Sequence, residues 1–540
     1  MGNRLYCGDN LDILRQHIRD ESVDLIYLDP PFNSNATYNV LFKAPGGEQS
    51  QSQIEAFDDT WHWGEPAERA FDAVMTSGNT DAAEMLRAMR GFLKENDMMA
   101  YLAMMAVRLL ELHRVLKPTG SLYLHCDPTA SHYLKILLDA VFGSLNFRNE
   151  IVWKRQSAHS DAKNKFSDIS DSILFYVKTK LSKFAPQFRA HDAQYLEKFY
   201  RFDDADGRGR YRLGDMASPN PRPNMMYEWR GFSFPAKGWR FQLETMQRLH
   251  SEGRIWYPKQ ADGSDDTSKR PALKRYLAEQ EGSIVTSVWD DIHPLHSAHQ
   301  ERLGYPTQKP LALLERILAA SSNEGDVVLD PFCGCGTTVH AAEKMGRRWI
   351  GIDITHLAIG LIQKRLIEAF PRVQFEVEGV PKDVGAAEAL AEADKHQFQL
   401  WACSMVEAVP FKGGRKGADG GVDGYIYFKP DGKTSEKAIV SVKGGKNVGV
   451  GMVRDLIATI ERERAKVGII LTLTEPTREM KKEAATAGLY KTEMLGDFPR
   501  IQILTVQDLF DGDRPRLPWI DPTVFKKAKR ERTEKQGDLF

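Results

Sequence analysis

The segment from Val327 to Thr337 constrains the fold of this chain more than any other. A short apolar run ends at Asp330, and a Pro-Phe-Cys-Gly-Cys-Gly turn then leads into a helical pattern. Glycines let the backbone approach a ligand closely, and the first turn of a helix has free N–H donors. This order predicts a strand, a ligand-binding turn and a helix in an α/β domain. The candidate ligand-binding residues of the turn are Asp330, Phe332, Gly334, Gly336 and Thr337.

A carboxylate follows the next predicted strand, residues 349–352, at Asp353. In nucleotide-binding α/β sheets an acid at this place accepts hydrogen bonds from a ribose, so we expect a ribose-containing ligand. A dinucleotide site would show G-x-G-x-x-G, whereas Gly336 is followed by Thr-Thr-Val, which disfavours NAD. The alternative is a tight turn without a ligand. A turn without a ligand would explain an isolated G-x-G, but it explains less well a longer motif that is followed by Asp353 after the next strand.

A second motif, Asp29-Pro30-Pro31-Phe32, directly follows the apolar run from Val23 to Leu28, which predicts a buried strand. A carboxylate, a carbonyl held beside a proline and an aromatic ring form a socket for a planar ring that carries an amino group. Asp29 would accept one amino hydrogen, the Pro30 carbonyl the other, and Phe32 would stack on the ring. The alternative, that the prolines only end the strand, is disfavoured by the ribose site elsewhere in the chain.

The two motifs, in this order, resemble the permuted β group of the DNA amino-methyltransferases that use S-adenosylmethionine. In that family a D/S-P-P-Y/F/W motif precedes a target-recognition region, and F-x-G-x-G follows it. The resemblance covers most of residues 5–377 and includes Gly8-Asp9, the stretch 149–154 and the stretch 305–310. It implies a doubly wound, Rossmann-like α/β sheet in which both motifs face one crevice. It also implies that Asp9, Thr307 and Lys309 belong to the cofactor site.

The resemblance implies methyl transfer to the exocyclic amine of a base that is flipped out of duplex DNA. Such an amine is a poor nucleophile, so acceptors that favour a pyramidal nitrogen assist the transition state. In the family an Asp at the first motif position usually accompanies adenine N6 methylation and Ser accompanies cytosine N4 methylation, so Asp29 favours adenine. Three alternatives stay open: cytosine N4, an RNA or protein amine, and a DNA-binding regulator on an inactive methyltransferase fold.

The length of 540 residues predicts more than one domain. We expect two methyltransferase halves, residues 1–146 and 303–384, around an inserted region, 147–302, for which the resemblance implies target recognition. A smaller C-terminal α/β domain, 385–518, and a disordered basic tail, 519–540, would follow. In the inserted region several aromatic and basic side chains suit base stacking and phosphate contacts, and equally suit a core and a solvated surface: Trp229, Arg230, Trp239, Arg240 and the cluster Arg208–Arg212.

Residues 402–509 resemble the Mrr-like branch of the PD-(D/E)xK nucleases. The motifs are Asp-Gly-Gly-Val-Asp ending at Asp423, and Ser441-Val-Lys443. The family implies a divalent metal such as Mg²⁺ held near Asp423 and Lys443. Ser441 departs from the expected acid or amide, and a hydroxyl is a weaker ligand for a hard cation. Glu407, expected on the preceding helix, is the candidate substitute. An active nuclease and an inactive DNA-binding module remain equal alternatives.

The composition limits the kinds of partner and the cellular location that we expect for this chain. The 73 Lys and Arg against 74 Asp and Glu give a net charge of −1, so contact with DNA requires local patches. No apolar run approaches the ~18 residues of a membrane span, and we expect a cytoplasmic protein. The five cysteines lack CxxC spacing, which predicts reduced, unligated thiols.

The last five residues resemble the Q-x-x-L-F peptide that bacterial proteins insert into the replication sliding clamp, with Gln536, Leu539 and Phe540 at the fixed positions. Two apolar side chains at the end of a disordered tail suit an apolar groove on a partner. The alternative is an incidental hydrophobic terminus. The expected partners are therefore double-stranded DNA and this clamp, with a homodimer left open.

Overall fold

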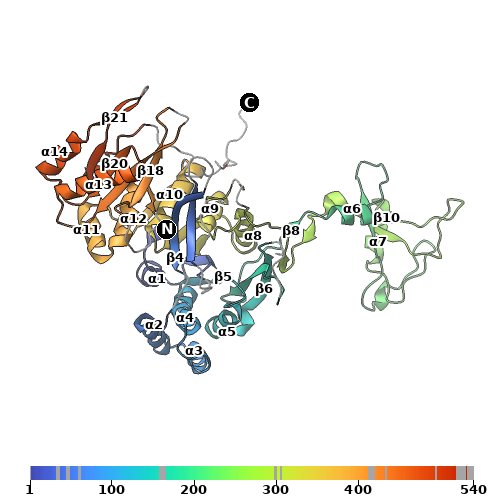
Figure 1. Ribbon diagram of the computed structural model, residues 1–540. Coiled ribbons are helices and arrows are strands. Elements are labelled where there is room, and N and C mark those ends of the chain that lie inside the picture. Colours follow the sequence, from blue (N-terminus) through green and yellow to red (C-terminus); the bar gives the residue numbers. More distant parts are fainter. Residues whose placement is uncertain are drawn as a thin grey trace. The chain divides into compact units, whose positions relative to one another are not determined.

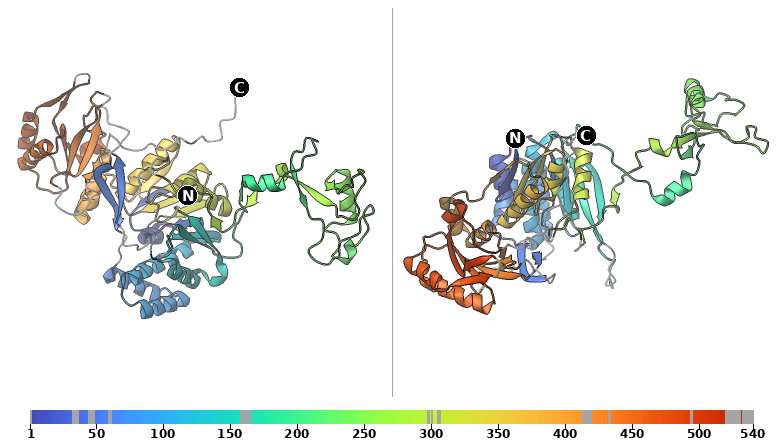
Figure 2. Two further views of the ribbon diagram at one scale, coloured as in Figure 1. Left: turned by 45° about the vertical axis from the view of Figure 1, so that its right-hand side comes forward. Right: turned by 90° about the horizontal axis from the view of Figure 1, so that it is seen from above.

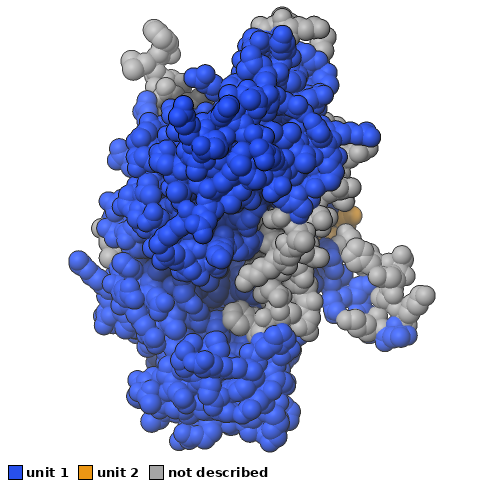
Figure 3. Space-filling view, turned by 60° about the vertical axis from the view of Figure 1, so that its left-hand side comes forward, with its two compact units in different colours: residues 1–185, 287–540 blue, residues 186–286 orange. Residues whose placement is uncertain are grey.

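The computed structural model describes residues 2–31, 62–156, 164, 166–296, 299, 301–303, 307–411, 420–431, 434–492, 495–518 and 531, and the backbone of 37–43 and 49–58. Phe32, Asp419 and the predicted clamp-binding residues Gln536, Leu539 and Phe540 lie outside the described residues. The chain divides into two compact units, Met1–Ala185 with Ser287–Phe540, and Pro186–Thr286; Figure 3 colours the two units separately.

A nine-stranded sheet forms the centre of the first unit (Figure 1), with the strand order β13-β6-β7-β5-β2-β14-β15-β1-β16. The six neighbouring strands β5-β2-β14-β15-β1-β16 are parallel to one another, and β7 runs antiparallel to both of its neighbours. The predicted α/β fold is confirmed. The bounds are β1 Asn3–Cys7, β2 Val23–Leu28, β5 Leu116–Cys126, β6 Phe147–Lys154, β7 Ser170–Val177, β13 Val288–Trp289, β14 Val327–Asp330, β15 Arg348–Asp353 and β16 Phe375–Glu378.

The register of the central strands brings the two sequence motifs together. Every residue of β2 is buried, as its apolar run predicts for a strand covered on both faces. Strand β14 pairs in parallel with β2, Val328 opposite Leu25, and with β15 on its other side. Asp29 and Asp330 therefore stand at the carboxyl ends of adjacent strands, where α/β sheets bind ligands.

Helices cover both faces of this sheet (Figure 2). One layer buries its apolar side chains with those of β2 and β5 in a single core: α1 Asn10–His17, α2 Glu65–Met75, α3 Thr80–Leu93, α4 Asp97–Val115 and α5 Ser131–Phe142. The other layer comprises α8 Leu311–Ser321, α9 Thr337–Lys344 and α10 His356–Ala369. On that second face the hydroxyl of Tyr123 in β5 lies 2.6 Å from the hydroxyl of Ser321 in α8. A separate hairpin joins β3 Thr37–Lys43 to β4 Gln49–Asp58.

The second unit, 186–286, lies within the predicted recognition region but is shorter than it, because β6, β7 and β13 join the central sheet. Its strands and helices are β8 Phe188–Arg189, α6 Ala193–Phe199, β9 Tyr211–Gly214, α7 Leu243–Ser251, β10 Ile255–Trp256, β11 Ala272–Tyr276 and β12 Ser283–Ile284. Trp229 and Trp239 are 6% and 0% exposed and form its core. Of the two roles considered for these tryptophans, the structure favours the core. Arg208 pairs with Asp206 at 2.6 Å.

The C-terminal part is built around a five-stranded sheet with the order β17-β18-β19-β20-β23. Helix α11 lies at the start of the predicted C-terminal domain, 385–518. The bounds are α11 Val384–Ala393, α12 Lys395–Met405, β17 Val409–Pro410, β18 Gly424–Phe428, β19 Glu436–Lys443, α13 Val450–Arg462, β20 Val467–Thr472, α14 Arg478–Thr486, β21 Leu489–Thr492, β22 Gly496–Pro499, β23 Ile501–Thr505 and α15 Val506–Phe510. Across all described residues, no helix combines the length and apolar character needed to span a membrane.

Candidate active site

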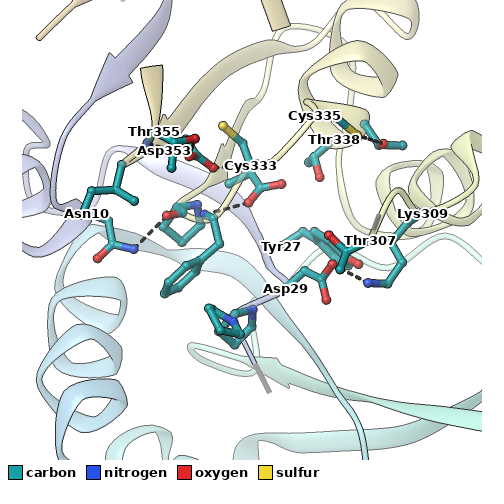
Figure 4. Close-up of a pocket in the computed structure, with 18 of the residues that line it drawn as sticks. Asn10, Tyr27, Asp29, Thr307, Lys309, Cys333, Cys335, Thr338, Asp353 and Thr355 are labelled. Carbon is teal, nitrogen blue, oxygen red and sulfur yellow. Dashed lines mark hydrogen bonds and ion pairs between the residues drawn. The ribbon is translucent and has the colours of Figure 1, made fainter. Parts of the chain in front are cut away.

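A cavity of about 370 Å³ opens at the carboxyl ends of β2, β14 and β15 (Figure 4). Its wall includes the following residues predicted for the site: Asp9, Asp29, Pro30, Pro31, Thr307, Lys309, Asp330, Phe332, Gly334, Thr337 and Asp353. Gly336 instead caps α9 in the left-handed region at φ 75°, and a Cβ there would meet Ile362 Cγ1 at 2.8 Å. This glycine thus lets α9 pack against α10. The cavity brings together residues from the two ends of the predicted methyltransferase region.

Asp353 closes one side of the cavity and fixes the glycine turn. Its Oδ2 accepts a hydrogen bond from the Gly334 N–H at 2.9 Å, and its Oδ1 accepts from the N–H and hydroxyl of Thr355 at 3.0 and 2.9 Å. Burial raises the pKa of Asp353 to about 6, and these hydrogen bonds partly oppose that shift. Each carboxylate oxygen has two lone pairs, so the group retains acceptor capacity toward a ligand.

Asp330 adds a second carboxyl to the cavity. Its Oδ1 accepts a hydrogen bond from the Phe332 N–H at 3.0 Å. Burial raises the pKa of Asp330 to about 7; the charges of Asp29 and Asp353 act in the same direction, and a hydrogen bond from Thr338 opposes them. Because four carboxyl groups, those of Asp9, Asp29, Asp330 and Asp353, line one cavity, a cationic group on a ligand would be favoured there.

Asp9 belongs to a fixed corner of the wall. It caps α1 by accepting from the Leu11 N–H at 2.8 Å, and both of its oxygens accept from the Arg108 guanidinium at 2.8 and 3.0 Å. Its neighbour Asn10 donates to the Pro331 carbonyl at 2.8 Å, which ties the start of α1 to the glycine turn. No sequence motif singles out Asn10 or Arg108, because both lie within ordinary helical patterns.

Asp29 and Lys309 form a buried ion pair at the other side of the cavity. The Lys309 ammonium lies 2.5 Å from Asp29 Oδ2, and the two side chains are only 11% and 15% exposed. Asp29 Oδ1 is buried as well, and among the described residues it has no hydrogen-bond partner. A buried acceptor without a partner costs free energy unless a ligand satisfies it. The resemblance implies a cofactor contact for Lys309, and that prediction stays open: Lys309 lines the cavity, and its ammonium pairs with the carboxylate of Asp29.

A hydrogen-bonded chain of three buried side chains lies beside this pair. The Tyr27 hydroxyl is 2.9 Å from His125 Nδ1, and His125 Nε2 is 3.1 Å from Asp171 Oδ2. These residues come from β2, β5 and β7, and Tyr27 lines the cavity. None of the three belongs to a motif predicted from the sequence. The sequence offers one sign of them, since His125 and Asp171 are polar residues within two otherwise apolar strand patterns.

The predicted metal site of the C-terminal domain centres on Asp423, directly before β18. Its Oδ2 accepts from the Val442 N–H of β19 at 2.6 Å, next to Ser441, which is 3% exposed. Glu407 is not on the preceding helix as expected. Helix α12 ends at Met405, and Glu407 follows with an exposed side chain at φ 54°.

Within α12, the Gln399 amide donates to Asp423 Oδ1. The described part of the domain offers no group of three His, Cys, Asp or Glu side chains that could hold a metal ion. Among the described residues, Asp423 supplies a carboxylate at this place and Ser441 a hydroxyl, and Mg²⁺ prefers carboxylate oxygens.

Residues 23–364 match the family of DNA methylases, and the chain belongs to this family. Residues 390–507 match a family of restriction endonucleases. Both resemblances stated from the sequence are thereby confirmed. The chain joins a DNA methyltransferase of the restriction-modification type to an Mrr-like nuclease domain.

Curated relatives are restriction-modification methyltransferases. The type II methyltransferase M.EcaI of Enterobacter cloacae is 29% identical over 399 residues, which cover 73% of this chain and 76% of that protein. The Mod subunit of the type III enzyme StyLTI of Salmonella typhimurium is 26% identical over 353 residues, 63% of this chain and 49% of that one. M.BamHI of Bacillus amyloliquefaciens is 26% identical over 364 residues, 67% of this chain and 56% of that one. The chain thus spans about half the length of the last two.

Proposed function

We propose that this protein transfers the methyl group of S-adenosylmethionine to N6 of adenine in duplex DNA. The proposal rests on the two carboxylate oxygens of Asp29, a residue of the cavity wall. Its Oδ2 accepts a hydrogen bond from the Lys309 ammonium, whereas its buried Oδ1 has no hydrogen-bond partner among the described residues. An amino group on a planar base would satisfy this oxygen.

The chain's own groups account for the reactivity of the amine. Asp29 Oδ1 accepts one amine proton and the Pro30 carbonyl accepts the other. Because the nitrogen gains positive charge as it is methylated, both acceptors stabilise the transition state more than the ground state. The methylated nitrogen then loses one proton, for which Asp29 is the acceptor. Phe32, outside the described residues, is the proposed stacking platform for the flipped base.

The cavity fits S-adenosylmethionine. When bound, this cofactor supplies a methyl group whose bond to a cationic sulfur breaks with its electron pair left on sulfur. Asp353 would accept hydrogen bonds from the ribose hydroxyls, and the turn of Gly334 and Thr337 would provide close backbone contacts. The carboxyl of Asp330 suits the positive charge of the sulfonium.

Adenine is preferred to cytosine because of Asp29, and a labelled-methyl experiment separates the two. DNA is incubated with methyl-tritiated S-adenosylmethionine and digested to nucleosides, and we expect the label in N6-methyladenine. Label in N4-methylcytosine would replace adenine as the target, and transfer only to RNA or protein would overturn DNA as the acceptor.

The Asp29→Ala variant tests the site itself. We expect it to abolish transfer while calorimetry shows S-adenosylmethionine binding largely intact, since Asp29 faces the target side of the cavity. Asp12→Ala, an exposed carboxylate on α1, is the matched control and should methylate normally. Retained transfer in Asp29→Ala would contradict the assignment.

We propose that the C-terminal domain binds the same DNA, with or without cutting it. The match to restriction endonucleases and the anchored carboxylate of Asp423 support it. Whether the domain cuts DNA or only binds it depends on whether Asp423 and Lys443 acquire a metal, which is tested below.

A further inference from the structure

Lys309 reaches Asp29 from the short connection that leads into α8 (Figure 4). Residues 307–310 of this connection form neither helix nor strand. A lysine side chain is long and flexible, so an ammonium held 2.5 Å from one carboxylate oxygen depends on a fixed backbone. The neighbouring residue Gln308 also lines the cavity, and the transfer described above gives it no role.

The side-chain amide of Gln308 is bonded to the backbone at both of its ends. Its Oε1 accepts a hydrogen bond from the Leu303 N–H at 2.7 Å, and its Nε2 donates to the Glu301 carbonyl at 2.7 Å. A backbone N–H only donates and a carbonyl only accepts, so these two partners fix which end of the amide faces each of them. Gln308 is thereby attached to residues five and seven positions earlier in the chain.

Glu301 forms a second attachment, at the start of α8. Its Oε1 accepts from the N–H of Leu311, the first residue of that helix, at 2.6 Å. A carboxylate at this place satisfies one of the N–H groups that a helix leaves without an internal partner, and it interacts favourably with the helix dipole. Glu301 therefore holds Gln308 through its carbonyl and α8 through its carboxylate, and Lys309 lies between these two attachments.

We propose that Gln308 is a positioning residue for methyl transfer, which fixes the backbone from which Lys309 holds the carboxylate of Asp29. The inference rests on the proposed function, because it assumes that Asp29 accepts a proton of the target amine. Pro310 restricts the backbone of Lys309 on one side, and the amide of Gln308 fixes it on the other. A small displacement of Asp29 would slow the reaction strongly, since the rate depends on how the acceptor is aligned with the amine.

Gln308→Met tests the inference, because it removes both bonds and keeps the length of the side chain. At saturating S-adenosylmethionine and DNA we expect kcat to fall about tenfold or more, with the melting temperature unchanged. Gln502→Met is the matched control: in the C-terminal domain Gln502 accepts from the Arg516 N–H at 2.7 Å and donates to the Arg516 carbonyl at 2.8 Å. Its removal should leave kcat unchanged.

Gln308→Glu adds a test that depends on pH. A protonated carboxyl can make both bonds of the amide, whereas an ionised one can only accept and places a negative charge against the Glu301 carbonyl. The kcat of this variant, divided by that of the unmodified protein, should therefore fall as the pH rises from 5 to 8. The charged and titratable groups around this connection are present in both proteins, so the ratio isolates the new carboxyl: Glu301, His299, Glu315 and Arg365.

A double-mutant cycle separates positioning from a general effect on the fold. If Gln308 acts through Lys309, the double variant with Lys309→Met is no slower than Lys309→Met alone, because the contact with Asp29 is already lost. A merely structural role of Gln308 would make the two losses in kcat additive.

Three results would overturn the inference: an unchanged kcat in Gln308→Met, additive losses in the double variant, or a kcat ratio for Gln308→Glu that does not fall with pH. If Gln308→Met does not fold, Gln308→Glu decides, because at low pH it keeps both bonds. Label transfer by the unmodified protein in the same assay separates these outcomes from a failure of the proposed function, since an inactive unmodified protein would refute the function itself.

Discussion

The ammonium of Lys309 lies 2.5 Å from Oδ2 of Asp29 although the two residues are 280 positions apart in the chain. This contact joins the two halves of the methyltransferase region at the wall of the cavity. It also gives the two carboxylate oxygens different roles, one bound to the ammonium and one facing the cavity. In the proposed reaction, a carboxylate fixed in this way needs no reorientation when the amine binds.

Lys309→Met should lower both activity and stability. Removing one partner of a buried ion pair leaves an uncompensated charge, which costs about 3–5 kcal/mol in the free energy of unfolding. We expect kcat to fall at least tenfold, because Asp29 loses its fixed orientation. Denaturant unfolding and methyl-transfer kinetics measure the two effects.

The double variant Lys309→Met with Asp29→Asn should regain much of the stability without regaining activity, since it removes the stranded charge. Lys344→Met is the control, because Lys344 forms a surface pair with Glu315 and its side chain is 38% exposed. We expect that change to cost less than about 1 kcal/mol. An unfolding free energy in Lys309→Met equal to that of the control would show that the pair is not important for stability.

Cofactor affinity should depend on pH through Asp353. Burial raises the pKa of this carboxyl to about 6, so it is ionised above that pH and protonated below it. The ribose hydroxyls donate best to the ionised form. Affinity should therefore fall as the pH drops through about 6, and Asp353→Asn should remove that part of the dependence.

Calorimetric titrations with S-adenosylmethionine between pH 5 and 8 measure the effect, and the difference between the two proteins isolates Asp353 from Asp330, whose pKa is raised to about 7. At pH 8, Asp353→Ala should weaken binding by about 1.5–3 kcal/mol, the worth of hydrogen bonds to a charged group. Equal affinities would remove Asp353 from the cofactor site.

If the C-terminal domain cleaves DNA, cleavage should require Mg²⁺ or Mn²⁺ and disappear in Asp423→Ala and Lys443→Ala. Methylation should be unaffected in both variants. The assay uses unmethylated, hemimethylated and fully methylated DNA with and without EDTA. Cutting that persists in EDTA would refute a metal site at Asp423, and intact DNA in every arm would leave the domain a binding role.

Deleting residues 536–540 should abolish binding to the sliding clamp and leave methylation of naked DNA unchanged. A tethered methyltransferase would meet newly replicated sites at raised effective concentration. Calorimetric titration of purified clamp tests this prediction. A full-length protein that fails to bind at tens of micromolar, about −6 kcal/mol, would refute it.

The sequence predicted the parts of the site that depend on local pattern. Asp29 follows β2, whereas Asp330 and Asp353 are the last residues of β14 and β15, and parallel strands bring their carboxyl ends to one edge. The β2–β14 pairing at Leu25 and Val328 then places two of them together. Motif order, strand periodicity and the glycine turn were enough for this result.

The sequence does not predict which side chains far apart in the chain contact each other in the fold. The contact of Lys309 with Asp29 depends on how the chain enters α8, and a lysine before a proline has no local signature for it. His125 and Asp171 sit in strands whose apolar neighbours suggest simple core. For Trp229 and Trp239, composition alone left stacking and burial equally open, and burial in the core of the second unit decides between them.

The two chain connections of the unit 186–286 run side by side, because β8 and β12 pair with Arg189 opposite Ser283. Outside this ribbon, Ala185 is tied to Ala320 and Ser287 to Val152 by backbone hydrogen bonds. A segment attached at two neighbouring points can be replaced as a cassette while β2 and β14 keep their register. Recombination between related genes at these two points would exchange the unit 186–286 as a whole. Laboratory chimeras can be joined at the same two points.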